Sequence, residues 1–446
     1  MYLAQSCSKL YISKENILMF RSNMGKIMIS SHVSKKQLLP LCFGVLAFLF
    51  LLSSTGSSAY RANQPAHRAS SNIDSWNNIH PFLMFDYNIS NPAAVAPRYD
   101  YVSGASWYNV AAFRSTNPNI SLIYYVPFHR DNGTFTDYNA LRSLATWKST
   151  HPHWILYKCD RMTPAYEYGN PNVPLDFSNP ALVTWQVQNY ALPASKRGYD
   201  GIIADNLNLQ NLFGACGIYD KTGKWVQRYT GKANDPQWLQ DVLTWVTGMQ
   251  AALHNLPHPL ALIPNLDTGK ALAPTDPRLQ LVLDHIDGVL DEAGFTYYGT
   301  GDLTGNTWLL KYQLGEYVQS QGKPFYSVNN FSSLNHVNIQ WALASYLMIK
   351  EHTCAVFIST TQDYGNDAWY QEYQAQIGTP LNSMYQGQGV YWRDYSNGVS
   401  IVNSASRGTF TVNLNAAFQY VDLYGNPVGP TVTMPPHSGL VLLIQS

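Results

Sequence analysis

Two short segments of the sequence share one pattern: an Asp-Gly step, an apolar run, and a carboxylate five positions after the Asp. They run from Tyr199 to Asp205 and from Ile286 to Glu292. Because the two segments have the same register, Asp205 and Glu292 are predicted to point into one site. Cleavage of a glycosidic bond needs such a pair, since one carboxyl protonates the leaving oxygen while the other attacks the sugar carbon or activates water.

A neighbouring acid leaves the second assignment open. Asp291 directly precedes Glu292, and a shift of one residue would exchange the side chain that faces the site. An acid at a strand end can also simply cap the helix that follows. Both residues therefore stay candidates at this position.

Eight short apolar runs are the elements that would position these acids. Continuous apolar runs bounded by polar residues are typical of buried parallel strands. The runs cover residues 82–85, 122–126, 154–157, 201–204, 260–263, 288–290, 325–328 and 355–358.

Helical stretches alternate with these runs. Three of them begin with Asn or Asp followed by Pro, which combines a capping side chain with a residue suited to the first helical position. These starts are Asn179-Pro180, Asp235-Pro236 and Asp276-Pro277, and further helices are expected over 138–150, 308–319 and 339–349. The alternation predicts an α/β fold, a (β/α)8 TIM barrel over residues 78–378.

The pattern changes after about Gly378. Apolar and polar residues then alternate, with turn residues between the runs, which indicates short antiparallel strands. These strands are expected near 390–393, 399–402, 409–412, 420–423 and 439–444. Residues 386–446 are therefore predicted to form a small C-terminal β domain, sandwich-like, that packs against the barrel or binds carbohydrate.

Polar residues just past the strand ends are the candidate substrate contacts, because functional groups of such barrels lie there. Asp86 and Asn88 either contact substrate or form a turn, while Lys158 and Asp160 either pair with each other or bind sugar hydroxyls. The full set is Asp86, Tyr87, Asn88, Lys158, Asp160, Asn206, Asn265, Asp267, Asp291 and Asn329.

The composition bears on the partners. Lys plus Arg and Asp plus Glu both number 28, so the formal net charge is zero, which argues against a nucleic-acid partner. Charged residues make up only 13%, as do aromatic residues, which suits either neutral ligands such as sugars or simply a polar extracellular surface. The sequence has no Cys/His spacing typical of zinc and no Gly-x-Ser-x-Gly motif, so neither a metal nor another cofactor is expected.

The N-terminus carries the one long apolar run. Lys35 and Lys36 precede an apolar stretch over 38–52, and small residues follow over 53–59. This order is typical of a signal peptide, with an uncleaved anchor as the alternative. Residues 1–59 are thus interpreted as a signal or anchor with an upstream extension, and 60–77 as a linker. We expect a secreted monomer with no other membrane contact.

Three cysteines follow this segment. Cys159 and Cys216 come after consecutive predicted strands, which allows a disulfide between the two loops, whereas Cys354 lies in an apolar run and is expected in the core.

Several segments resemble a hypothetical glycoside hydrolase-like TIM-barrel family of secreted proteins. They are 198–206, 287–292, 154–157, 175–180 and the end around Arg393 and Asn397-Gly398. The resemblance implies hydrolysis of O-glycosidic bonds in an extracellular poly- or oligosaccharide. In related barrel families the acid on strand 4 is the nucleophile and the acid on strand 6 the proton donor. Carried over, this implies Asp205 as nucleophile or base and Glu292 as acid/base. The alternative is a catalytically inactive, secreted carbohydrate-binding barrel.

Overall fold

The computed structural model describes residues 79–131, 143–167, 172–266, 273–299, 301, 303–351, 353–360 and 363–445, all within one compact unit. The segments interpreted from sequence as a signal or anchor and as a linker, 1–59 and 60–77, lie outside the described residues. Within the described part of the chain, no helix is both long and apolar enough to cross a membrane.

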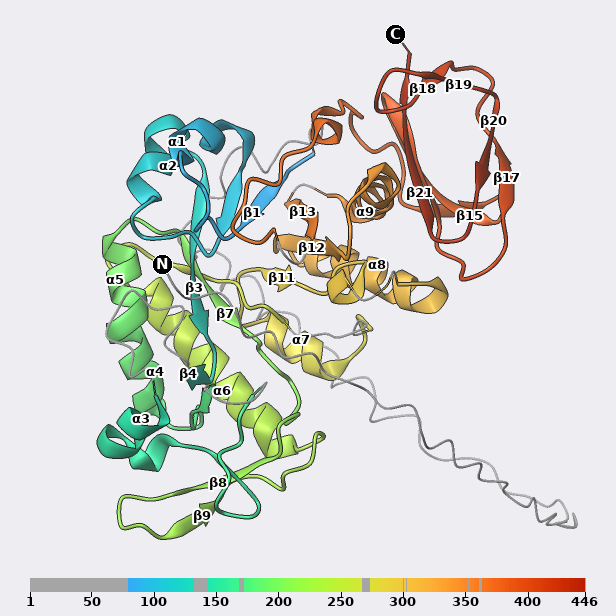
Figure 1. Cartoon of the computed structure of the whole chain (residues 1–446). Helices are drawn as coiled ribbons and strands as arrows, with labels where there is room; N and C mark the ends of the chain where they lie inside the picture. Colours follow the sequence, from blue (N-terminus) through green and yellow to red (C-terminus); the bar gives the residue numbers. More distant parts are fainter. Residues whose placement is uncertain are drawn as a thin grey trace, which may run out of the picture. The chain divides into compact units, whose positions relative to one another are not determined.

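Eight parallel strands form the framework of the chain between Phe82 and Thr360 (Figure 1). Five of them form a sheet in the order β1-β2-β3-β7-β10, and three form a sheet in the order β11-β12-β13. Isolated parallel bridges, Asn265 to Leu290 and Pro81 to Val356, connect strands of the two sheets. The strands are β1 Phe82–Met84, β2 Tyr101–Ser103, β3 Ser121–Pro127, β7 Gly201–Asp205, β10 Ala261–Leu262, β11 Val289–Asp291, β12 Phe325–Phe331 and β13 Cys354–Thr360.

One of the predicted barrel strands is wrong. The run 154–157 contributes only to β5 (Tyr157–Lys158), which pairs antiparallel with β8 (Ala215–Tyr219) in a sheet completed by β9 (Trp225–Gln227). β2, which lies between β1 and β3, is the eighth parallel strand, and β3 pairs directly with β7. The run is apolar because Ile155 and Leu156 are buried beside the main sheet, and burial alone does not fix the strand direction.

The helices lie between the parallel strands in sequence. The three predicted Asn-Pro and Asp-Pro starts are confirmed, because Asn179, Asp235 and Asp276 each cap a helix with the side chain. The helices are α1 Pro92–Val95, α2 Val110–Thr116, α3 Leu144–Thr150, α4 Pro180–Gln186, α5 Leu192–Lys196, α6 Pro236–His254, α7 Pro277–Leu283, α8 Gly305–Ser320 and α9 His336–Ile349.

Alternate residues of the parallel strands enter two different cores. Successive side chains of a strand point to opposite faces, and the smaller core gathers one alternate set, including Ile203, Leu290 and Tyr326. The larger core contains their neighbours, such as Ile202 and Val289, together with the helices. The same alternation determines whether a residue at a strand end points toward the smaller core or toward the helices.

The predicted antiparallel strands of the C-terminal part are confirmed (Figure 1). A six-stranded sheet runs in the order β14-β15-β16-β21-β18-β19, and β17 pairs with β20 in a second sheet. The strands are β14 Tyr385–Gly387, β15 Val390–Tyr395, β16 Gly398–Asn403, β17 Phe410–Asn413, β18 Tyr420–Val421, β19 Pro427–Val428, β20 Thr431–Met434 and β21 Ser438–Ile444.

The C-terminal strands pack on α9, with hydrogen bonds from Tyr395, from Ser400 and, in the largest number, from Arg393. The Arg393 guanidinium donates to the main-chain oxygens of Leu347, Met348 and Lys350, at 2.8–3.1 Å, and to Glu351 Oε1 at 2.6 Å. It therefore satisfies carbonyl groups that the end of a helix leaves without partners. Residues 341–350 are buried without interruption, so α9 is enclosed by its neighbours.

The cysteines behave as the sequence indicates. Cys159 and Cys216 form a disulfide that ties the turn after β5 to β8, and Cys354 is free and buried in β13.

Candidate functional site

Asp205 lies at the end of β7 and is buried among hydrogen-bond donors. It follows Ile203 by two residues and so shares the face of the smaller core. Its Oδ2 accepts from the Arg130 guanidinium at 2.5 Å and from Asn206 Nδ2 at 2.7 Å. The Tyr125 hydroxyl is hydrogen-bonded to the same carboxylate. Charge-assisted hydrogen bonds such as that from Arg130 are about twice as strong as neutral ones, so they hold the carboxylate in place.

Asn265 joins Asp205 to Glu292. Its side-chain Nδ2 lies 2.9 Å from Asp205 Oδ1 and 2.7 Å from Glu292 Oε2. One nitrogen contacts both oxygens, so these two oxygens are no more than about 5.6 Å apart. The matched Asp-Gly segments therefore do bring the two acids together.

Glu292 receives neutral donors on both oxygens. Besides Asn265 on Oε2, the Tyr364 hydroxyl donates to Oε1 at 3.2 Å. Asn330 Nδ2 donates in turn to the Tyr364 oxygen at 2.6 Å. Burial and the Glu292 charge raise the pKa of Tyr364 well above its usual value, so this hydroxyl stays a donor at ordinary pH.

A second buried carboxylate stands behind Arg130. The guanidinium contacts Glu167 Oε2 at 3.2 Å as well as Asp205, and Asn208 Nδ2 donates to Glu167 Oε1 at 2.6 Å. His129 Nε2 lies 3.9 Å from the same carboxylate. Burial, and then the Arg130 charge, lower the pKa of His129 to about 3. Arg130 is thus shared between two carboxylates, and His129 is neutral.

The backbone at two strand ends is left-handed. Phe85 follows β1 with φ of 63° and Asn206 follows β7 with φ of 54°, a conformation that is uncommon outside glycine. The Phe85 ring contacts those of Tyr125 and Tyr364 at centroid distances of 5.1 and 6.2 Å. Tyr125 is hydrogen-bonded to Asp205 and Tyr364 to Glu292, so Phe85 packs beside both carboxylates.

The residues predicted after β1 divide between different environments. Asp86 is buried, and its oxygens accept from the Ser106 main chain and hydroxyl and from Asn109 Nδ2. It therefore holds the loop after β2, and burial raises the pKa of Asp86. Tyr87 is 55% exposed, whereas the main-chain nitrogen of Asn88 donates to Gly365. Contact of these three residues with substrate stays a prediction.

Lys158 and Asp160 lie in and directly after β5, which belongs to the antiparallel β5-β8-β9 sheet, called the side sheet below, and not to the parallel strands. Both side chains are exposed. Asp160 accepts from Met162 N, Thr163 N and the Thr163 hydroxyl, which closes a local turn and, with Lys158 nearby, lowers the pKa of Asp160 to about 2. No described contact joins them to Asp205 or Glu292, and Asp267 lies outside the described residues.

Two predicted residues face away from the acids. Asp291 follows Leu290 by one residue, so it points to the helix side, where Lys311 Nζ of α8 contacts its Oδ1 at 2.7 Å. Asn329 is likewise on the outer face of β12, and its Oδ1 accepts from Phe295 N at 2.9 Å. Its neighbour Asn330 is the one that reaches Tyr364.

The sequence-based set lacks three residues that contact the acids, Arg130, Tyr125 and Tyr364. It also lacks Glu167 and Asn330, which contact Arg130 and Tyr364. Arg130 and Asn330 lie four and two residues past the ends of the predicted strands 122–126 and 325–328, so their position is a usable signal. Glu167 and Tyr364 lie in loops where no pattern marks them.

The sequence profile of hypothetical glycosyl hydrolase family 15 matches residues 114–399, well over half of the chain. The chain belongs to this family. The match includes both segments with the Asp-Gly pattern. Membership of hypothetical glycosyl hydrolase family 15 supports a carbohydrate-hydrolysing role for the protein. No curated protein sequence matches the chain.

Solved structures similar to this family member include three glycoside-cleaving enzymes. A family 39 glycoside hydrolase from Bacteroides cellulosilyticus WH2 shares 10% identity at a TM-score of 0.45, with 84% of this chain and 82% of that chain covered. An α-amylase from Malbranchea cinnamomea shares 11% identity at 0.41, with 83% and 97% covered. The maltogenic α-amylase AmyB from Thermotoga neapolitana shares 11% identity at 0.44, with 83% and 90% covered.

The site of this family member offers acceptors as well as acids. Asn265 Oδ1 and Asn330 Oδ1 are buried and have no hydrogen-bond partner among the described residues. Buried polar atoms are normally paired, so both are suited to accept from ligand hydroxyls. In the same described ranges, no group of three or more His, Cys, Asp or Glu side chains could hold a metal ion.

Proposed function

We propose that the protein hydrolyses O-glycosidic bonds of a poly- or oligosaccharide by a retaining mechanism, with Asp205 as nucleophile and Glu292 as acid/base. The observation that carries this proposal is the single Asn265 nitrogen that contacts both carboxylates. It limits the separation of the facing oxygens to about 5.6 Å. Retaining enzymes have carboxyls about 5–5.5 Å apart, whereas inverting enzymes need about 6.5–9.5 Å to admit a water.

The two environments favour different roles for the acids. Asp205 contacts a guanidinium, which stabilises a carboxylate and so favours attack on carbon. The donors described above for Glu292 are the neutral Asn265 and Tyr364, which tolerate a protonated acid more readily than a cation would. Different surroundings for two carboxyls are the usual way in which one acid and one base work at the same pH.

The reaction would then proceed in two displacements. Glu292 gives its proton to the glycosidic oxygen while an Asp205 oxygen attacks the anomeric carbon, so the sugar–oxygen bond breaks and a glycosyl ester forms. Ionised Glu292 then takes a proton from water, whose oxygen attacks the same carbon and releases the Asp205 carboxylate. The orphan amide oxygens of Asn265 and Asn330 are placed to accept from sugar hydroxyls.

The remaining proposals concern architecture and location. We infer that the eight parallel strands close into a (β/α)8 barrel whose mouth holds the two acids. We also infer that the protein is secreted and acts outside the cell on the saccharide. The Cys159–Cys216 disulfide supports this, because such bonds persist mainly in oxidising compartments.

A screen for reducing ends on a panel of glycans tests the proposed activity. On any glycan that is cleaved, Asp205→Asn and Glu292→Gln should each lower kcat by about 10²–10⁴-fold. Asp160→Asn, which changes an exposed acid on the side sheet, should leave it unchanged. Proton NMR of the first product should show retained anomeric configuration. An inverted product would refute the nucleophile role, and glycan binding without any turnover would indicate the inactive, binding-only barrel.

A further inference from the structure

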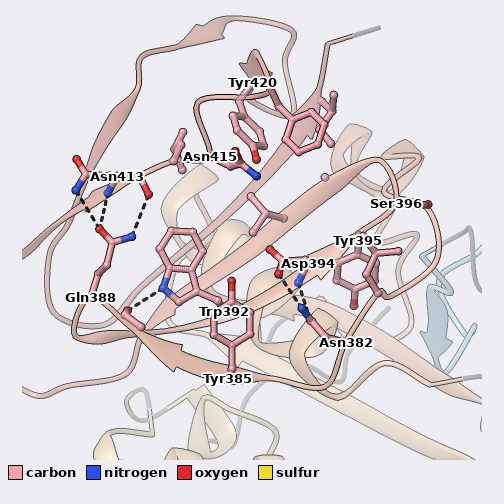
Figure 2. A pocket seen from close by; sticks show the side chains of 17 residues that line it. Asn382, Tyr385, Gln388, Trp392, Asp394, Tyr395, Ser396, Asn413, Asn415 and Tyr420 are labelled. Atoms are coloured by element: carbon pink, nitrogen blue, oxygen red, sulfur yellow. Dashed lines mark hydrogen bonds between the residues drawn. The ribbon is translucent and has the colours of Figure 1, made fainter.

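The C-terminal β domain contains a hollow of about 470 Å³ (Figure 2), a size within the range of about 300–1,000 Å³ that small-molecule sites have. It opens on one face of β15. Trp392 and Asp394 line it, whereas Arg393 between them points to α9. The small second sheet covers part of the same face, since Val412 of β17 packs in one core with Trp392. The hollow begins where β17 ends, at Asn413.

Aromatic rings line this hollow at two levels. Tyr385 and Phe418 are 42% and 46% exposed, so their faces are available to a ligand. Trp392 lies deeper, where its Nε1 donates to Gly387 O at 2.8 Å. Phe418 and Tyr420 meet edge to face at 6.2 Å. Exposed aromatic rings beside such a hollow are suited to pack against the apolar face of a sugar ring.

Polar groups alternate with these rings. Asp394 Oδ2 accepts from Asn382 Nδ2 at 2.7 Å, and the Tyr385 hydroxyl is hydrogen-bonded to the same carboxylate. Figure 2 shows these three side chains together on one wall, with Asn415 and Tyr420 on the other. Asn415 Oδ1 accepts from Ala417 N at 3.0 Å, which orients the amide and leaves its Nδ2 to donate to a ligand.

The rim is fixed by a further amide pair. Gln388 Nε2 donates to Asn413 O at 3.0 Å, and its Oε1 accepts from Asn413 N at 2.8 Å. These bonds tie the turn before β15 to the end of β17. The two sides of the hollow are therefore connected without a ligand.

The charges of the hollow select its ligand. None of the 17 residues that line it is Lys, Arg or His, so an anionic ligand would meet no counter-charge. Asp394 is the one carboxylate among them, and it already accepts from two neutral side chains. A fitting ligand is therefore neutral, carries hydroxyl groups, and presents apolar faces to Tyr385 and Phe418.

From these features we infer a second saccharide-binding site, separate from Asp205 and Glu292, in which a neutral oligosaccharide packs on Tyr385 and Phe418 and hydrogen-bonds Asp394 and Asn415. The inference does not depend on the proposed hydrolysis. Such a site would hold the protein on a polysaccharide chain whether or not a glycan is bound or cleaved at Asp205 and Glu292.

Affinity electrophoresis of the full chain tests the site. The gels contain soluble starch, dextran, galactomannan, arabinoxylan or mixed-linkage β-glucan, with polygalacturonate as an acidic comparison. The Asp205→Asn/Glu292→Gln double variant serves as the parent, which prevents digestion of the gel. We expect retardation by at least one neutral glycan and none by polygalacturonate. Tyr385→Ala and Phe418→Ala should each weaken that retardation about tenfold or more, while Tyr385→Phe and Phe418→Tyr keep it within about threefold.

The outcomes separate this inference from the proposed function. Retardation that is lost with Asn265→Ala but unaffected by Tyr385→Ala and Phe418→Ala would place all binding at the barrel acids, which overturns the second site and leaves the proposed hydrolysis standing. Retardation by none of the neutral glycans also overturns it, as does stronger retardation by polygalacturonate. Conversely, dependence on Tyr385 and Phe418 in a protein without any glycosidase activity would support the second site alone.

Discussion

Lys311 Nζ lies 2.7 Å from Asp291 Oδ1, and both side chains are buried between β11 and α8. Removing one partner of a buried pair costs about 3–5 kcal/mol, because the other charge is left uncompensated. Asp291→Asn should therefore lower the free energy of unfolding by that amount, measured in urea. The double variant Asp291→Leu/Lys311→Met should recover much of the loss, since apolar replacement of a whole pair is often neutral.

Glu292→Gln is the matched change one residue along the chain. It should lower glycosidase activity and change the free energy of unfolding less than Asp291→Asn does, because the Gln side chain keeps an oxygen that can accept from Asn265 or Tyr364. A stable but inactive Asp291→Asn, beside a strongly destabilised Glu292→Gln, would reverse the assignment of the two acids.

Asn329 and Asn330 should separate in the same way. Asn330→Ala removes the donor that positions the Tyr364 oxygen, so kcat should fall about tenfold or more with little loss of stability. Asn329→Ala leaves Phe295 N without its acceptor and should cost about 1–3 kcal/mol of unfolding free energy, while the folded fraction keeps its activity. An unchanged kcat in Asn330→Ala would show that Tyr364 needs no support from Asn330.

His129 should make stability depend on pH. Its pKa is about 3 in the folded protein, against about 6.5 in an unfolded chain. Between these values the unfolded state binds the additional proton, so stability falls as the pH decreases from about 6.5 towards 3, by on the order of 5 kcal/mol in full. His129→Phe keeps a ring against Phe128 and Trp238 and should flatten this dependence. His258→Phe, at an exposed position, should leave it as in wild type, and identical slopes for all three proteins would contradict the prediction.

Gly231 lies against the disulfide, and Gly223, in the turn between β8 and β9, is its matched control. Both have positive φ, of 76° and 79°, so alanine costs each about 1–2 kcal/mol in backbone conformation. A Cβ at Gly231 would lie 2.7 Å from the sulfurs of Cys159 and Cys216, whereas one at Gly223 would meet no atom within 4 Å. Gly231→Ala should therefore lose about 1–3 kcal/mol more than Gly223→Ala in urea unfolding without reductant. Equal losses would show that the sulfurs move aside freely.

The parts of the fold that follow from local chemistry could be predicted from sequence. Capping by Asn179, Asp235 and Asp276 depends on neighbours within three residues, so the pattern was sufficient. The common orientation of Asp205 and Glu292 could also be predicted. Side chains of a strand alternate between its two faces, so two segments with the same spacing direct their acids to the same face.

The parts that depend on distant pairing could not be predicted. The apolar run 154–157 looks like a parallel strand in sequence, but its strand pairs antiparallel with β8. The parallel strand β2, Tyr101–Ser103, is too short to be recognised from its sequence. The sequence pattern indicates Asn329 as the site residue, whereas Asn330 faces the site. An error of one residue moves the predicted side chain to the opposite face of the strand. Glu167 reaches Arg130 from a loop, and a sequence alone does not indicate where a loop returns.

The enclosure of α9 limits how this chain can be divided. Residues 341–350 are buried in an unbroken run, and Arg393 of the C-terminal strands supplies donors to the end of that helix. A truncated gene product ending near residue 378 would uncover the buried side of α9 on which the C-terminal strands pack, and would be expected to aggregate. The C-terminal strands therefore cannot be exchanged like an independent module, and shuffling between genes must transfer them together with the last helix and strand of the preceding domain.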